Sequence, residues 1–358
     1  MSAAKGHAGP CFEDFAPGQI LDCPVARRIT DGDLAAYLTF TGDRTAPYCG
    51  AAPRVHPLIV FHIALGQTVR QVSLNARANL GYAELRWLRE VRVGDVLRSR
   101  VEILGLKENS DGRHGIVWLR TTTRDQDDRT ALSYVRWVML PKRGQDRTSW
   151  REAPLIPTLA PALRAEDLAP CEIDPETADP PQGPWFLEDY APGERIEHGE
   201  AQLVTDAEHM GFTRLFQNSA RVHFQGRPLV YGGYVISLGY AQAHSGLENR
   251  LGLWAINAGS HIAPVYAGDT LSSSTEILEV SPLPGRPWGA LRCRLQVVAA
   301  GAETRPVLEL DYWERLPRRY PDHESDRARG SCASEALPRE GAQPPISAAR
   351  TSGPTAGV

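Results

Sequence analysis

An internal repeat limits the folds that this 358-residue chain can adopt. Residues 12–18, with the sequence FEDFAPG, align with residues 187–193, LEDYAPG, at an offset of 175 positions. The same offset pairs Thr30 with Thr205. Self-similarity over this length indicates two copies of one folding unit. The chain is therefore expected to form two related modules, each large enough to bury a core of its own.

The repeat and the composition together predict four parts. The first copy is expected to span 11–143 and the second 185–319. Between them, residues 144–184 are rich in Pro, Asp, Glu and Ala, which is typical of a linker. After residue 319 the apolar periodicity ends and Ser, Pro, Gly and Ala dominate, so residues 320–358 are predicted to be a disordered tail.

The overall composition excludes several classes of protein. A net charge of −4 and a pI near 6.2 leave no basic stripe for nucleic acid. The six cysteines lack paired spacing, so neither a disulfide framework nor a zinc site is expected. The sequence has no run of about 18 uncharged apolar residues, so no membrane span is expected. We expect a cytoplasmic protein with no metal, no cofactor, no nucleic-acid partner and no membrane association.

Each copy shows the same order of predicted elements. Thr30 and Thr205 each precede an acidic first turn, which is the pattern of a helix N-cap. Long uncharged segments follow at 57–66 and 233–241, and a helix that is apolar on every side must be surrounded by protein. Alternating and β-branched runs then predict strands at 95–106, 115–123 and 131–141. The pattern favours an α+β fold in which an antiparallel sheet wraps around one central helix per copy. Two generic α+β sandwiches are the alternative.

Residues 213–224, TRLFQNSARVHF, and 226–233, GRPLVYGG, resemble the MaoC-like (hydratase 2) dehydratase family, and within it the subgroup that hydrates mesaconyl-CoA. The resemblance extends over about residues 11–319. It implies a tandem (double) hot-dog fold and a hydro-lyase that reversibly hydrates an enoyl-CoA thioester, mesaconyl-CoA to β-methylmalyl-CoA. A CoA thioester is then the expected partner. Because hot-dog proteins commonly pair their sheets, a homodimer is also expected.

The family carries an Asp and, five residues later, a His, and the second copy keeps this spacing with Asn218 and His223. Imidazole titrates near neutral pH, so His223 is the expected base that takes a proton from water. An amide cannot act as a base, so Asn218 is expected to orient the water or the imidazole. The first copy has Asp43 and Tyr48 at these positions. We therefore expect the second copy to hold the active site and the first to complete its pocket.

Two further groups are expected to bind the substrate. Gly232 and Gly233 stand directly before the second apolar segment, and N–H groups at a helix N-terminus favour the negative charge of a thioester oxygen during reaction. Mesaconyl-CoA also has a free carboxylate, which Arg can bind through two parallel hydrogen bonds. Arg221 and Arg214 are the candidates, because both lie within the motif.

Gln217 and Tyr231, which belong to the same motif, are expected to contact the substrate as well. His56 is expected to line the corresponding pocket of the first copy, where the acyl or pantetheine portion passes. His62, inside the first apolar segment, is expected to be a hydrogen-bonded core histidine. Two rival functions remain open: a less selective (R)-specific enoyl-CoA hydratase, in which Arg221 is dispensable, and a non-catalytic acyl-CoA-binding protein.

Overall fold

The computed structural model describes residues 8–50, 52–144, 146, 148–168, 181–301 and 303–319. The predicted disordered tail over 320–358 lies outside the described residues, as does the part of the predicted linker from 169 to 180. Both halves of the repeat belong to one compact unit.

The first half begins with short strands and helices and ends with four long strands. In chain order these elements are η1 (Phe12–Asp14), β1 (Ile20–Asp22), β2 (Arg27–Arg28), α1 (Asp31–Thr41), α2 (Ala46–Cys49), α3 (Pro57–Thr68), the π-helical turn η2 (Val69–Ser73), β3 (Ala78–Trp87), β4 (Val96–Glu108), β5 (His114–Arg124) and β6 (Thr130–Pro141). The strands predicted from sequence correspond to β4, β5 and β6, so that prediction is confirmed.

The second half repeats this order after the 3-10 turns η3 (Ser149–Arg151) and η4 (Ala165–Asp167). Its elements are η6 (Leu187–Asp189), β7 (Arg195–Leu203), α4 (Asp206–Leu215), η7 (Arg221–His223), α5 (Gly232–Gln242), β8 (Gly252–His261), β9 (Thr270–Pro282), β10 (Trp288–Ala300) and β11 (Arg305–Pro317). The Thr30 side chain accepts a hydrogen bond from Asp33 N–H, and Thr205 accepts one from Glu208 N–H. These caps confirm the predicted starts of α1 and α4.

All strands pair antiparallel, in the order β1-β4-β5-β6-β3-β8-β11-β10-β9-β7, with β2 paired to β4 off this path. The two halves meet where β3 pairs with β8, for example at Ala83 and Ala258. Strand order on one side of this junction mirrors the order on the other. The exact boundaries of the copies, 11–143 and 185–319, remain a prediction.

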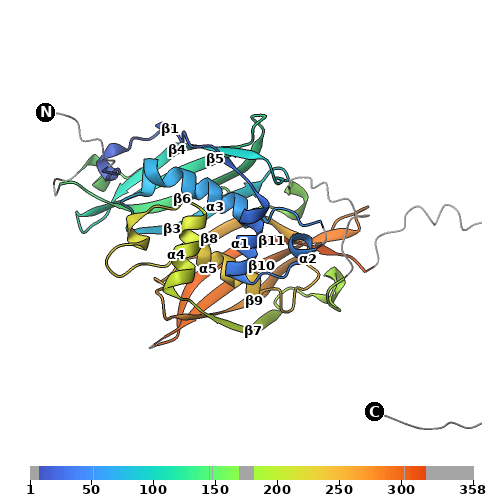
Figure 1. The fold of residues 1–358 in the computed structure, drawn as a ribbon. Coiled ribbons are helices and arrows are strands. Elements are labelled where there is room, and N and C mark those ends of the chain that lie inside the picture. The colour runs from blue at the N-terminus through green and yellow to red at the C-terminus, as the bar shows by residue number, and fades with distance from the viewer. Residues whose placement is uncertain are drawn as a thin grey trace, which may run out of the picture. The chain divides into compact units, whose positions relative to one another are not determined.

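The two uncharged segments form the central helices. Helix α3 packs on strands of the first half and α5 on strands of the second (Figure 1). Every residue of α3 after Pro57, and every residue of α5 after Gly232, is buried. This confirms that helices apolar on all sides are enclosed by protein. No helix in the described part of the chain is long and apolar enough to cross a membrane.

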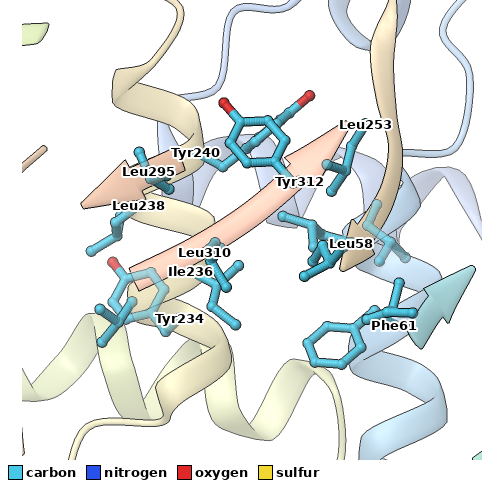
Figure 2. Close-up of a cluster of buried hydrophobic side chains, with 14 of the residues drawn as sticks. Leu58, Phe61, Tyr234, Ile236, Leu238, Tyr240, Leu253, Leu295, Leu310 and Tyr312 are labelled. Carbon is cyan, nitrogen blue, oxygen red and sulfur yellow. The ribbon is translucent and has the colours of Figure 1, made fainter. Parts of the chain in front are cut away.

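Side chains from both helices meet one another and the sheet in a shared apolar core. Figure 2 shows Leu58 and Phe61 of α3 near Ile236 of α5 and Leu310 of β11. Because one core joins the two central helices, the halves are held together by apolar burial as well as by the sheet.

Candidate active site

A cavity of about 400 Å³ lies between the two halves. The second half contributes the motif residues and the start of α5 to its wall, and the first half contributes strands β3 and β6. Residues of the wall with polar side chains include Asn218, His223, Tyr231, His261, Asn79, Tyr82 and Arg136, and Gly232 lines the wall as well. The cavity therefore brings residues of both copies to one place.

His223 ends the short turn η7 and is 7 % exposed. Its Nδ1 lies 2.8 Å from the carbonyl oxygen of Leu229. Because a carbonyl can only accept, Nδ1 carries the proton and Nε2 keeps its lone pair. Burial lowers the pKa of His223 to about 4, so the ring is neutral at pH 7. This tautomer and charge are those that a general base needs.

Asn218 is buried in the same wall, within residues 216–223, a segment that covers part of the cavity. Its Oδ1 accepts a hydrogen bond of 3.1 Å from the Ala220 N–H. The side-chain oxygen is thus held by the backbone, and the amide NH2 is the group that Asn218 can offer to a ligand. The segment rests on α3: a Cβ at Gly66 would lie 1.9 Å from the carbonyl oxygen of Phe216.

Helix α5 starts at the cavity, with Tyr231 as its N-cap. The first hydrogen bonds at this end come from the N–H groups of Tyr234 and Val235, which both donate to the Tyr231 carbonyl. The N–H groups of Gly232 and Gly233 precede them and belong to the helix end that attracts negative charge. Of these two glycines, Gly232 lines the cavity. The Tyr231 ring also packs against His223, with centroids 5.6 Å apart.

Comparison with known proteins finds relatives over most of the chain, although no family model matches it. The mesaconyl-CoA hydratase of Cereibacter sphaeroides is 41 % identical over 348 residues, which are 88 % of this chain and 100 % of that protein. The chain belongs to the MaoC-like dehydratase family.

Two solved structures support the assignment. A MaoC domain protein dehydratase from Chloroflexus aurantiacus superimposes with a TM-score of 0.81 at 36 % identity, covering 89 % of this chain and 100 % of its own. A Mycobacterium tuberculosis protein with a double hotdog fold matches with a TM-score of 0.70 at 29 % identity, covering 86 % of this chain and 98 % of its own. The predicted α+β double hot-dog fold is confirmed. The chain is a MaoC-like hydro-lyase that acts on acyl-CoA thioesters.

The first copy of this MaoC-like enzyme forms a larger cavity, of about 650 Å³, at the corresponding place. Tyr48 lines it where the second copy has His223, and Pro57 lines it where the second copy has Gly232. Proline has no N–H to donate. The larger cavity therefore lacks both the imidazole and the first helix N–H group at these positions.

The next donor of that helix is also occupied in the first copy. Leu58 N–H donates to His56 Nδ1 at 3.0 Å, and His56 Nε2 lies 3.2 Å from Asp43 Oδ2. Asp43 in turn pairs with Arg250 at 3.3 Å and accepts from Thr45. Asp43, the counterpart of Asn218, thus belongs to a buried structural network. Of the two equivalent cavities, the one with His223 has both a neutral imidazole and a glycine at the helix start.

His261, at the end of β8, also lines the MaoC-like cavity and was not found by sequence reasoning. Its Nε2 is buried with no hydrogen-bond partner among the described residues, and burial lowers its pKa to about 4. A Cβ at Gly232 would lie 2.5 Å from its Cε1, so the ring rests directly on the start of α5. No sequence motif marks His261, because only the pairing of β8 with its neighbouring strands places this residue at the cavity.

Four residues expected to bind substrate lie outside the described wall of this cavity. Arg221 binds the Ala8 carbonyl and the Asn75 side chain. Arg214 is exposed and lies over the Phe224 ring at 5.5 Å. Gln217 is exposed, and His56 is committed to its buried network. Their contact with substrate remains a prediction that this geometry does not favour.

Proposed function

We propose that this enzyme reversibly hydrates mesaconyl-CoA to β-methylmalyl-CoA. The observation that carries the proposal is the difference between the two equivalent cavities: one has a neutral imidazole and a glycine N–H at the helix start, and the other has Tyr48 and Pro57. The similarity to a mesaconyl-CoA hydratase over nearly the whole chain supports this substrate.

The proposed reaction adds water across the carbon–carbon double bond. His223 Nε2 takes a proton from water as the water oxygen bonds to the β-carbon. The π electrons move to the α-carbon and the thioester oxygen, where the N–H groups of Gly232 and Gly233 stabilise the developing charge. The imidazolium then returns a proton to the α-carbon on the same face. The amide NH2 of Asn218 holds the water oxygen.

Two rival functions make different predictions. A less selective enoyl-CoA hydratase would accept a monocarboxylic thioester such as crotonyl-CoA equally well. A non-catalytic acyl-CoA-binding protein would bind both thioesters and turn over neither. The expected homodimer and the cytoplasmic location are part of the proposal and need separate measurements.

The test follows the ultraviolet absorbance of the conjugated thioester, with mesaconyl-CoA and crotonyl-CoA as substrates. The wild-type enzyme should consume mesaconyl-CoA faster than crotonyl-CoA. The His223→Ala variant should still bind the thioester, but its kcat should be lower by about 10²–10⁴. Tyr48→Phe is the matched control, because it changes the equivalent position of the other cavity. Equal use of both thioesters would favour the general hydratase, and binding without turnover would favour the binding protein.

A further inference from the structure

Arg136, on β6, is a buried cation without an acidic partner in the part of the chain that the structure describes. It is 1 % exposed and lines the cavity. Its guanidinium donates to Asn79 Oδ1 at 3.2 Å, Thr68 Oγ1 at 2.9 Å and Ser73 Oγ at 3.3 Å, all of which are neutral. No carboxylate of the described residues forms an ion pair with it, and its Nε has no acceptor there. Burying a charge without a counter-ion is unfavourable, so this arrangement needs an explanation.

Arg250 shows what the same chain does with a structural buried arginine. It is also 1 % exposed, but it pairs with the Asp43 carboxylate at 3.3 Å and its guanidinium lies 4.1 Å from the centroid of the Tyr240 ring. Arg250 therefore has a counter-ion, whereas Arg136 has none among the described residues. The difference indicates that the described residues leave a place for the counter-ion of Arg136 that a bound ligand can fill.

Two neighbours of Arg136 in the cavity wall also have unused donors. Tyr82 stands directly opposite Arg136 in the pairing of β3 with β6, and its hydroxyl is buried with no partner among the described residues. Asn79 Nδ2 is likewise buried without an acceptor in the described part. Its orientation is fixed chemically, because Arg136 can only donate and must face the amide oxygen. Three donor groups thus converge on one part of the wall.

Among the described residues, the ionisable side chains that respond to the charge of Arg136 do not supply a negative charge. These side chains include Cys23, Tyr82, Tyr134 and Tyr231. Burial raises the pKa of each of them, so all four stay neutral at physiological pH. A ligand that accepts hydrogen bonds and carries negative charge would satisfy this part of the wall.

We propose that Arg136, Asn79 and Tyr82 bind the free carboxylate of a substrate that is the CoA thioester of a dicarboxylic acid. The proposal rests on the hydration proposed above and names the residues that select its substrate. In mesaconyl-CoA the free carboxylate is bonded to the β-carbon, the atom that water attacks. Arg136 lines the same cavity as Tyr231, whose ring packs against His223. Its charge would offset the repulsion between the carboxylate and the incoming oxygen, so Arg136 acts on kcat as well as on KM.

The experiment compares mesaconyl-CoA with crotonyl-CoA in wild type and three variants. Arg136→Gln should lower kcat/KM for mesaconyl-CoA by about 100-fold, because one partner of a buried charge pair is removed, and leave crotonyl-CoA close to its wild-type value. Asn79→Asp supplies a carboxylate within the chain as a partner for Arg136. The unfolding temperature of this variant should stay the same or rise, and its preference for mesaconyl-CoA over crotonyl-CoA should be lost. Arg221→Gln, the rival carboxylate ligand, should keep the preference.

The outcomes separate the two proposals. If wild type hydrates neither thioester, the proposed function fails. If wild type prefers mesaconyl-CoA and both Arg136→Gln and Asn79→Asp retain that preference, the carboxylate site is wrong while the hydratase stands. Loss of the preference in Arg221→Gln alone would move the site to that arginine. Should Arg136→Gln not fold, Asn79→Asp decides, because it is isosteric and adds the missing counter-ion.

Discussion

His62 of α3 and Ser237 of α5 occupy equivalent positions of the two copies, 175 residues apart, and hydrogen bond to each other with Nε2 and Oγ separated by 2.8 Å. Both side chains are fully buried. The other ring nitrogen of His62, Nδ1, lies 3.1 Å from the Tyr231 hydroxyl. His62 is therefore the hydrogen-bonded core histidine that was predicted. It links the two copies and supports Tyr231, the N-cap residue of α5.

Replacing Ser237 by Ala should destabilise the protein by about 1–3 kcal/mol, because a ring nitrogen of His62 would stay buried without a partner. Urea denaturation measures this change. Ser260→Ala is the matched control, since Ser260 is exposed on β8. Equal stabilities of the two variants would contradict a structural role for the His62 bond.

Replacing Gly66 by Ala should impair catalysis although Ala favours helices. The added Cβ would overlap the Phe216 carbonyl oxygen, and backbone on both sides leaves little room to adjust. The segment that carries Asn218 would shift, and a displacement near 1 Å can lower kcat/KM by about 10². Gly32→Ala in α1 is the control, because its Cβ would meet Thr30 Oγ1 at an ordinary 3.5 Å. Unchanged turnover in Gly66→Ala would show that the covering segment does not depend on this close approach.

Replacing Gly232 by Pro should reproduce the first copy, where Pro57 starts α3. Proline is tolerated at the first position of a helix but removes the N–H group, so kcat should fall by about 10²–10³. Gly232→Ala is the necessary comparison, because it also places a Cβ against His261 but keeps the N–H. The same rate in the Pro and Ala variants would assign the loss to His261 and not to the helix donor.

The sequence could predict the elements whose causes are local. Repeated N-caps and two uncharged segments favoured a sheet around one central helix per copy, and the family resemblance implied the double hot-dog fold. Motif spacing indicated His223, and the start of the second apolar segment indicated Gly232. Arg136 and His261 escaped because each lies on a strand whose pairing alone brings it to the cavity. Proximity in sequence favoured Arg221 instead, yet that side chain is held by Asn75 and the Ala8 carbonyl. Side-chain direction, which depends on tertiary contacts, could not be read from spacing.

The depressed pKa values of His223 and His261, each about 4, predict how stability depends on pH. An unfolded histidine titrates near 6.5, so between about pH 6.5 and 4 the unfolded chain binds more protons than the folded one. Stability should therefore be constant with respect to these groups above pH 6.5 and fall as the pH drops towards 4. Urea midpoints at pH 7.5 and 5 in wild type and in a His223→Gln, His261→Gln double variant measure this. The double variant should lose less stability on acidification, and an equal loss would contradict the buried, neutral state of both rings.

The same pKa should set the acid limb of activity, because the neutral form of His223 is the proposed base. In wild type kcat/KM should hold as the pH falls and decline only near pH 4. Asn218→Asp would place a carboxylate in the same wall, and a nearby negative charge favours the protonated imidazole. The acid limb should then move to higher pH, whereas Asn218→Ala should leave it in place and lower the rate by removing the donor to water. An unmoved limb in Asn218→Asp would mean that residue 218 does not interact with the His223 ring.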